Sequence, residues 1–422
     1  MNKHEIFDEI VAIMMRDSST KKDIVGADPE AFRQRLSEEM TSSDFLYVAK
    51  AYLASFGVIS HVGIGFKDRQ PLGFSVRRHE DALYVTRALP STGLKKEDKI
   101  RRINQQSIQA FYESHQDIFV SQIAERQTQD WLYLIGNCSD GQLSIERDGQ
   151  TLELTIQKPD SNETFGSPFE GYWIDDRTYY LKMENFADEP AIASLYKKVL
   201  SELEKAQNLI IDVRVNQGGS DSLYFPLLPY VLPAGKTYQD ISTEEEGMEI
   251  LYSDRNVDSR LAYFNTILLD EQVSAETRLM IEEMKAELMK HRGKGYVLYD
   301  NSDDSIFKNY VGVENSPKQV YVLSDVECGS SGDNFVLMMK NMPKVTVVGR
   351  PTLGILDYSN CTLVDLGEFE MIYPTSRNCC INKGQGMNDV GVLPDIYLPW
   401  TPEILTRDTD LECVLNMINR AG

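Results

Sequence analysis

The stretch from Tyr321 to Lys340, YVLSDVECGSSGDNFVLMMK, joins a short apolar run to an amphipathic segment through a tight turn of small residues. Tyr321-Val322-Leu323 predicts a buried strand, and the apolar positions after Asp333 recur at helical spacing. The turn between them predicts a hydroxyl, that of Ser330, at a helix N-terminus, where free backbone N–H groups favour developing negative charge. Ser330 is therefore a candidate nucleophile, although on this stretch alone a plain Ser/Gly helix cap is the commoner explanation.

The composition limits the classes of partner. The 422 residues suffice for two or three domains, and a hydrophobic content of 42% is that of a globular protein. A net charge of −22 argues against nucleic acid or an anionic membrane as partner, because both need a basic face, although solubility alone explains the acidity. No secretory signal or membrane-spanning run is visible. Six cysteines without CxxC spacing indicate reduced thiols in a cytoplasmic protein and argue against zinc binding, and we expect no metal or other cofactor.

The first 67 residues predict a helical region followed by the start of a strand. Two apolar stripes at helical spacing precede Gly57, and the chain then reads Val58-Ile59-Ser60-His61-Val62. We expect His61 at the beginning of this strand. A lone histidine between apolar residues is more often structural than catalytic, so its position alone does not assign it a role.

Residues 68–158 predict a small β-rich domain. We expect strands near 72–76, 82–86 and 100–103, a helix over about 116–135, and a hairpin over 141–156. The stretch GLKKEDKIRRINQQSI resembles the "GLKxGDxIxxING" motif of PDZ domains, which implies docking of extended peptides along a sheet edge. Glu97 stands where that family has glycine, a departure that we expect to matter little for the fold.

A polar linker, 159–168, leads to the largest part of the chain, expected to span about 165–400. Leu209 to Val213 predicts a strand covered on both faces, and it leads into a loop that contains Gly218-Gly219. The remaining expectations are a charged insertion over 236–316 with one helix at about 273–291, a hairpin over 362–373, and a helical tail over 401–422.

Four stretches occur in the order found in the tail-specific (carboxy-terminal processing) and tricorn-type serine proteases. DVRVNQGG (212–219) is similar to their "DxRxNxGG" loop, and CGSSGD (328–333) resembles their "SxxE" nucleophile turn. VVGRPTLG (347–354) and GVLPDI (391–396) resemble "VGxxTxG" and "GxxPDI". The resemblance covers about residues 45–400. It implies an α+β multidomain chain with an N-terminal helical segment, a PDZ-like β-rich domain and a crotonase-like protease core of β-β-α units (the ClpP/crotonase superfamily).

The resemblance implies a role for each matching position. Ser330 is the implied nucleophile, and the backbone N–H groups of Gly218 and Ser331 are the implied oxyanion hole. The bacterial processing enzymes use the lysine of "TxGKG" as base, but Ile355 stands at that position here. Like the tricorn core protease, this chain has a serine–histidine pair, Ser60-His61, ahead of the PDZ-like part, which implies His61 as the general base.

The acidic residue of the tricorn-type site corresponds to Asn388, with Asp389 beside it, and the sequence leaves open which of the two completes the set. Asn388 can hydrogen-bond an orienting hydroxyl or imidazole, but it does not stabilise an imidazolium by charge. We expect Asp212 and Arg214 to form a structural pair and Asp333 to lie at the start of the helix after Ser330.

These observations predict a serine endopeptidase that hydrolyses peptides or unfolded and C-terminal protein segments through an acyl-enzyme on Ser330. The alternative is a catalytically inactive peptide- or ligand-binding protein on the same fold, which Asn388 favours. An acyl-CoA enzyme of the crotonase type is the weakest candidate, because neither a PDZ module nor a Ser-His pair is expected there. Since relatives often form assemblies that enclose their sites, a homo-oligomer is a further expectation.

Overall fold

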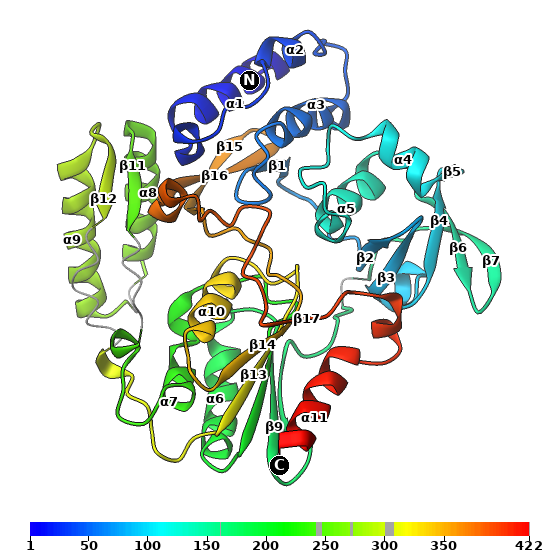
Figure 1. Cartoon of the computed structure of the whole chain (residues 1–422). Coiled ribbons are helices and arrows are strands. Elements are labelled where there is room, and N and C mark those ends of the chain that lie inside the picture. Colours follow the sequence, from blue (N-terminus) through cyan, green and yellow to red (C-terminus); the bar gives the residue numbers. More distant parts are fainter. Residues whose placement is uncertain (161, 242–246, 271–272, 300–307, 422) are drawn as a thin grey trace. The chain divides into compact units, whose positions relative to one another are not determined.

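The computed structural model describes residues 1–160, 162–241, 247–270, 273–299 and 308–421. Contacts divide the chain into two compact units. The first combines Met1–Arg69, Glu245–Asp303 and Asp357–Gly386, and the second combines Gln70–Glu244, Asp304–Leu356 and Met387–Gly422. Both units mix helices and sheets, so the α+β class predicted from the sequence is confirmed (Figure 1).

The first unit is built on an antiparallel sheet of order β1-β16-β11-β12, with β15 paired to β16. Its strands are β1 (Gly63–Phe66), β11 (Met248–Tyr252), β12 (Gly295–Tyr299), β15 (Tyr358–Leu366) and β16 (Phe369–Asn378). Its helices are α1 (Lys3–Arg16), α2 (Pro29–Arg33), α3 (Ser42–Ala54), α8 (Asp254–Leu268) and α9 (Ala275–His291), with 3-10 turns at Ser19–Lys22 and Cys379–Lys383. The hairpin predicted over 362–373 is confirmed as the inner part of β15–β16.

Two expectations for this unit were wrong in part. Besides α9, the predicted insertion contains α8, β11 and β12; its residues 242–246, 271–272 and 300–307 lie outside the described residues. The buried face of helix α8 has few apolar residues and includes Asn256. The Asn256 side-chain amide is satisfied there, because it donates to the carbonyls of Asp17 and Leu251 at 2.8 and 2.9 Å. His61 lies before β1 with a left-handed φ of 65°, not within the strand.

The second unit has a six-stranded sheet of order β17-β14-β13-β10-β9-β8, in which all pairs except β8–β9 are parallel. The strands are β8 (Phe169–Trp173), β9 (Thr178–Met183), β10 (Asn208–Asp212), β13 (Gln319–Ser324), β14 (Val345–Gly349) and β17 (Ile396–Tyr397). The helices around it are α6 (Glu189–Leu203), α7 (Leu228–Val231), α10 (Ser331–Lys340) and α11 (Thr409–Ala421), with 3-10 turns at Asp221–Leu223, Phe225–Leu227, Tyr238–Asp240 and Pro402–Leu405.

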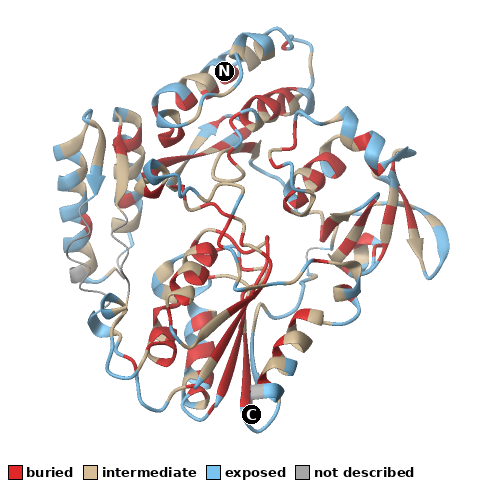
Figure 2. Cartoon of the chain, in the orientation of Figure 1, coloured by how far each residue is buried: buried red, intermediate tan, exposed pale blue. Residues whose placement is uncertain are grey.

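Both faces of this sheet are covered, as predicted for the strand at 209–213. Successive strand residues point to opposite faces. Leu209 and Ile211 of β10 pack in the core that α6, α7 and α10 complete, whereas Ile210 packs in a second cluster with Val414 and Ile418 of α11. Strand β10 is buried along its whole length, and the red central strands in Figure 2 mark this layer.

Residues 74–155 of the second unit form a separate antiparallel sheet of order β2-β3-β4-β6-β7, with β5 paired to β4. Its strands are β2 (Phe74–His79), β3 (Ala82–Ala88), β4 (Lys99–Ile103), β5 (Gln106–Ser107), β6 (Gln142–Arg147) and β7 (Gln150–Thr155). The predicted hairpin over 141–156 is confirmed. Helices α4 (Ile108–Ser114) and α5 (Thr128–Asn137) and 3-10 turns at Pro90–Thr92 and Ala124–Arg126 complete it.

The single helix predicted over about 116–135 was wrong. Helix α4 ends at Ser114, and α5 begins only at Thr128. Between them Ser121 turns the chain, because its hydroxyl accepts a hydrogen bond from Ile123 N–H at 3.0 Å and its carbonyl accepts one from Gln127 Nε2 at 2.9 Å. Such local side-chain bonds compete with helix formation.

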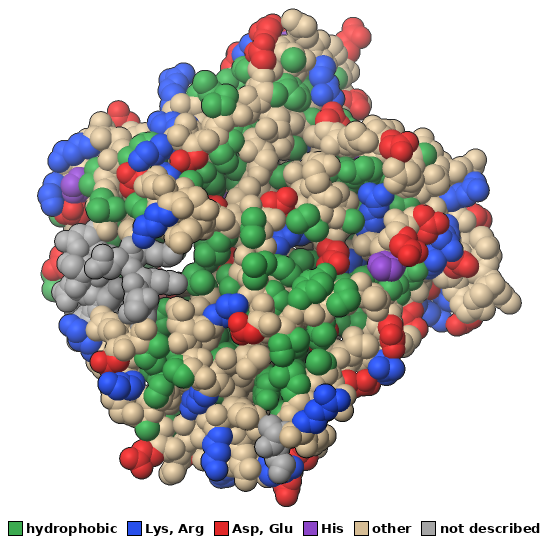
Figure 3. Space-filling model, viewed as in Figure 1, with side chains coloured by type: hydrophobic (Ala, Val, Ile, Leu, Met, Phe, Trp, Pro, Cys, Tyr) green, Lys and Arg blue, Asp and Glu red, His purple; other side chains and the backbone are tan. Residues whose placement is uncertain are grey.

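The surface carries charges of both signs. Acidic and basic side chains are interspersed over the face in view (Figure 3). Among the described residues, no helix combines the length and apolar character needed to cross a bilayer.

Candidate active site

The turn between β13 and α10 holds Ser330 in a conformation that is rare for a residue with a side chain. Its φ and ψ are 58° and −121°, and it occupies the N-cap position of α10. Non-glycine residues seldom adopt such a backbone, and those that do cluster at functional sites. A strained serine at a strand-to-helix turn is the geometry that presents a nucleophilic hydroxyl at a helix N-terminus.

Asp333 fixes this turn from the first turn of α10, where the sequence predicted an acidic residue. The fully buried carboxylate accepts hydrogen bonds from the N–H groups of Ser330 (2.8 Å), Gly354 (2.8 Å) and Ile355 (3.0 Å). Burial raises the pKa of Asp333, and these hydrogen bonds act in the opposite direction. The carboxylate thus joins the turn at Ser330 to the segment after β14.

The Gly218-Gly219 loop lies directly against Ser330. A Cβ placed on Gly218, whose φ is 86°, would lie 2.7 Å from Ser330 Cβ and 3.0 Å from the Ser331 nitrogen. Phe186 anchors the loop by donating its N–H to Gly218 O and accepting from Ser220 N–H, each at 2.7 Å. The structure therefore brings together Gly218, Ser330 and Ser331, three of the predicted site residues.

The N–H groups of this loop have different partners. Gly218 N–H donates to Asn216 Oδ1 at 2.9 Å. For Gly219 N–H the described residues offer no hydrogen-bond acceptor, and Gly219 O accepts from the Ser331 hydroxyl at 2.8 Å. The sequence predicted Gly218 as the donor, since a pair of glycines in a motif does not indicate which of the two amides is already bonded.

Ser60 and His61 belong to the first unit, so their approach to Ser330 stays a prediction. Within that unit His61 Nδ1 lies 2.7 Å from the carbonyl oxygen of Tyr358, the first residue of β15. A carbonyl only accepts hydrogen bonds, so Nδ1 carries the proton and the neutral imidazole has its lone pair on Nε2. Tyr358 was missed from the sequence, because its contribution is a main-chain atom.

Asn388 and Asp389 lie on the loop before β17, in the same unit as Ser330. Asp389, with a left-handed φ of 58°, accepts a hydrogen bond from the Ser121 hydroxyl at 2.7 Å and lies 3.8 Å from Arg126 Nε. The Asp389 carboxylate is thus engaged by the segment between α4 and α5. Asn388 is half-buried.

Ile355 occupies the position of the lysine in "TxGKG". Its side chain is buried, and its Cδ1 would lie 3.2 Å from a Cβ placed on Gly329, one residue before Ser330. A side chain at this position therefore reaches the turn at Ser330, but here it is hydrocarbon and cannot accept a proton.

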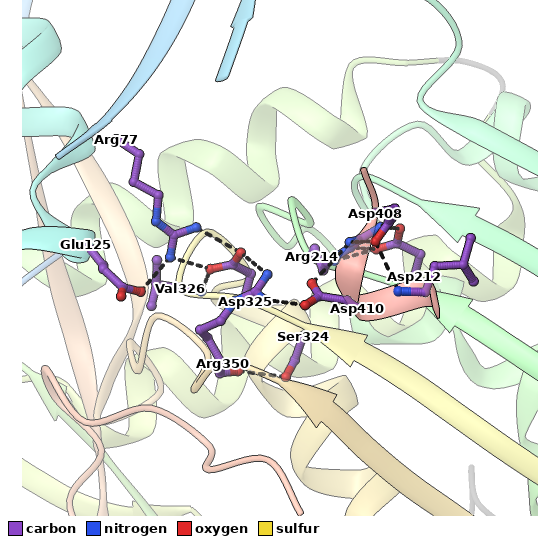
Figure 4. Close-up of polar contacts among 11 residues, drawn as sticks. Arg77, Glu125, Asp212, Arg214, Ser324, Asp325, Val326, Arg350, Asp408 and Asp410 are labelled. Carbon is purple, nitrogen blue, oxygen red and sulfur yellow. Dashed lines mark hydrogen bonds and ion pairs between the residues drawn. The ribbon is translucent and has the colours of Figure 1, made fainter. Parts of the chain in front are cut away.

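Buried ion pairs hold the start of the loop between β13 and α10 (Figure 4). Asp325 is paired with Arg77 of β2 at 2.8 and 2.9 Å and with Arg350 at 2.5 Å, and Arg350 also donates to Asp410 at 2.6 Å. Burial alone would raise the pKa of Asp325, but the two guanidinium groups hold it well below its ordinary value. None of these charges was assigned a role from the sequence.

The expected pair of Asp212 and Arg214 is confirmed as structural. Arg214 Nη2 lies 2.6 Å from Asp212 Oδ2 and 2.7 Å from Asp408 Oδ2, and Tyr180 OH donates to Asp212 Oδ2 at 2.6 Å. The pair fixes the end of β10 and the first turn of α11. Within the described part of the chain, no group of three or more His, Cys, Asp or Glu side chains is placed to hold a metal ion.

Comparison with known proteins gives a family and a fold. Residues 177–398, more than half of the chain, match the model of peptidase family S41. The structure resembles that of mature CPAF complexed with lactacystin (TM-score 0.66, 14% identity, 99% of this chain and 97% of that chain covered) and that of mature CPAF (0.63, 15%, 100% and 98%). It also matches the photosystem II D1 C-terminal processing protease (0.46, 14%, 96% and 94%).

At these identities the likeness to solved structures concerns the fold alone. No match was found among curated proteins. The family match includes the Gly218-Gly219 loop, the turn at Ser330 and the segment after β14 that the Asp333 carboxylate joins to it. The chain belongs to peptidase family S41, a family of serine-type peptidases.

Proposed function

We propose that the chain is a serine endopeptidase that hydrolyses peptides or unfolded protein segments, C-terminal segments among them, through an acyl-enzyme on Ser330. The observation that carries this proposal is the left-handed backbone of Ser330 at the N-terminus of α10, packed against Gly218. Holding a serine in this conformation costs free energy, and a simple helix cap does not require it.

In the first step His61 Nε2 takes the proton of the Ser330 hydroxyl while Oγ bonds to the carbonyl carbon of the scissile peptide. The negative charge that develops on the carbonyl oxygen is stabilised by the N–H groups of Ser331 and of the Gly218-Gly219 loop. Because Gly218 N–H already donates to Asn216 Oδ1, Gly219 N–H is the better second donor. The imidazolium then protonates the leaving amine, and water hydrolyses the acyl-enzyme by the same proton transfers.

His61 is the proposed base in preference to a lysine, because the buried Ile355 stands where the processing enzymes have their lysine. The Tyr358 carbonyl also favours the tautomer that leaves the lone pair on Nε2 of His61. Ser60 and Asn388 complete the proposed set by hydrogen bonding around the imidazole. Asn388 is preferred to Asp389, whose carboxylate is held by Ser121.

We also propose the following division of the chain into domains. Residues 1–67 form the helical region that carries Ser60 and His61, 68–158 a PDZ-like domain, 165–400 a crotonase-like core with the 236–316 insertion, and 401–422 the tail. The sheet edges at β2 and β7 suit strand addition by an extended peptide. A cytoplasmic location fits six cysteines that form no disulfide among the described residues, and the proposed homo-oligomer rests on the analogy with relatives.

Labelling with a fluorophosphonate probe, together with cleavage of a fluorogenic unfolded protein, tests the proposal. We expect labelling of the wild-type chain and its complete loss in Ser330→Ala. Ser331→Ala is the matched control, since it removes the hydroxyl bond to Gly219 O but keeps the backbone N–H. We expect His61→Ala to lose peptidase activity and His4→Ala, in α1, to retain it. Full activity in Ser330→Ala or His61→Ala would remove that residue from the mechanism.

The second candidate function is a non-catalytic peptide-binding protein, and the amide of Asn388 in place of a carboxylate favours it. The same assay separates the two functions. A folded wild-type chain that binds unfolded peptides but is never labelled would be a binding protein.

A further inference from the structure

Arg126, in the 3-10 turn Ala124–Arg126 between α4 and α5, is buried against main-chain carbonyl groups. Its side chain is 2% exposed. Its guanidinium donates to Thr352 O at 2.8 Å, to Val390 O at 2.7 Å, and to Leu353 O. Three carbonyl oxygens from two separate loops are therefore held by one side chain.

Burying the Arg126 guanidinium costs desolvation free energy, and packing alone does not require a charged side chain at this position. Burial lowers the pKa of Arg126, the direction expected for a cation removed from water, and the nearest carboxylate, Asp389, lies 3.8 Å from Nε, beyond hydrogen-bond distance. A buried cation whose main partners are neutral carbonyls recovers little of its desolvation cost by charge pairing. The planar guanidinium instead offers several N–H donors in fixed directions. It can therefore bind several carbonyl oxygens at once and fix their positions relative to one another.

The first loop that Arg126 holds is hydrogen-bonded to the nucleophile turn. Leu353 N–H donates to Cys328 O at 2.7 Å. The next two N–H groups, of Gly354 and Ile355, donate to the Asp333 carboxylate, which in turn accepts from Ser330 N–H at 2.8 Å. Two of the carbonyls that Arg126 binds, those of residues 352 and 353, are thus followed directly along the backbone by the two amides that bind Asp333.

The second loop is held twice by the same short segment. Arg126 binds Val390 O, and Ser121, five residues earlier, donates to Asp389 Oδ1. This loop carries Asn388. A segment without any residue predicted to be catalytic therefore contacts both loops that flank the proposed site.

We propose that Arg126 is a positioning residue, which sets the conformation of Ser330 through the 352–355 segment and Asp333, and the position of Asn388 through Val390. This role rests on the proposed function, which it deepens. Arg126 touches no reacting atom, so its loss should lower the reactivity of Ser330 and kcat, with little change in KM.

The test compares Arg126→Ala and Arg126→Lys with Arg147→Ala. Lysine keeps a buried cation but has a single ammonium that cannot reach three carbonyls. Arg147 is the control because it is an arginine of the same β-rich part of the chain that binds Asp98, at 2.6 and 2.7 Å, and is not bonded to either loop. The readouts are the rate of fluorophosphonate labelling, kcat and KM, and amide hydrogen exchange of peptides covering 328–334 and 352–356.

We expect labelling and kcat to fall by about a hundredfold in Arg126→Ala with KM within about threefold of wild type. Amide exchange in both peptides should become faster. Added guanidinium ion should restore part of the labelling rate in Arg126→Ala, and Arg126→Lys should remain slow. Arg147→Ala should keep wild-type labelling and exchange even if it melts at a lower temperature.

Wild-type labelling and exchange in both Arg126 variants would overturn the positioning role, as would a loss of labelling that Arg147→Ala reproduces at equal loss of stability. Hydrogen exchange reports on the turn whether or not the chain hydrolyses peptides. A wild-type chain that is never labelled would refute the proposed function and is distinguished from these outcomes.

Discussion

His61 Nδ1 lies 2.7 Å from the carbonyl oxygen of Tyr358, so the imidazole is oriented by a neutral main-chain acceptor within its own unit. We expect the neutral ring to carry its proton on Nδ1. Nitrogen-15 chemical shifts of labelled histidine, assigned by comparison with His61→Gln, measure the tautomer directly. A proton found on Nε2 would contradict the proposed direction of proton transfer from Ser330.

We expect alanine to have a different effect at each of the two loop glycines: a loss of activity at Gly218 and a loss of stability at Gly219. In Gly218→Ala the new Cβ would lie 2.7 Å from Ser330 Cβ, so we expect peptidase activity and Ser330 labelling to fall by at least about a hundredfold. In Gly219→Ala it would lie 2.0 Å from Phe186 O, so we expect the free energy of unfolding to fall by about 3 kcal/mol.

Urea unfolding and labelling of both variants give this comparison. Wild-type labelling in Gly218→Ala would show that the loop does not press on the nucleophile. A Gly219→Ala variant with unchanged stability would contradict the close approach to Phe186.

Glu97 offers a test of the cost of a left-handed residue. Its φ is 81°, a left-handed value that glycine adopts without strain and that glutamate adopts at a cost. We expect Glu97→Gly to raise the free energy of unfolding by about 0.5–1 kcal/mol, because the relief of backbone strain exceeds the added entropy of the unfolded chain. Gly93→Ala, also left-handed at φ 78° with open space around it, should have the opposite sign. A loss of stability in Glu97→Gly would refute this reading.

The ion pairs of the second unit predict acid sensitivity. Asp212, Asp325 and Asp408 have pKa values lowered in the folded state, where arginine side chains outweigh the effect of burial. Their contribution to stability is complete above the unfolded pKa of about 3.9 and is lost as the pH falls through the folded values. We expect the free energy of unfolding, measured with urea, to decrease steadily below about pH 4.

Asp325→Asn should lower the stability at pH 7 by about 3–5 kcal/mol, because Arg77 and Arg350 would remain buried with one partner fewer. The same variant should show a weaker acid dependence than the wild type, since one of the titrating carboxylates is gone. An acid profile identical to that of the wild type would exclude Asp325 as a contributor.

The sequence predicted the elements whose pattern is local. The strand and helix around Ser330, the doubly covered strand β10 and the β15–β16 hairpin all have apolar periodicity or turn residues that indicate their type. Helix α8 was missed because Asn256 occupies its buried face. The helix predicted over 116–135 was wrong because side-chain bonds of Ser121 outweighed the apolar pattern.

The sequence predicted only those members of the candidate site whose role depends on the residue type. Ser330 and the Gly218-Gly219 loop could be chosen on that ground. The Tyr358 carbonyl and the carbonyls bound by Arg126 could not, because every residue has a carbonyl and only the fold determines which of them a side chain reaches. That the Gly218 N–H already has an acceptor is known only once the Asn216 side chain is placed.

Strands β10, β13 and β14 run parallel, so the loops that leave them emerge at one edge of the sheet. These loops supply Gly218, Ser330 and the 352–355 segment, while the strands themselves contribute only packing. Insertions or replacements in those loops could therefore change which polypeptides are cleaved without rebuilding the layers beneath, which makes this edge the natural place to engineer a new specificity.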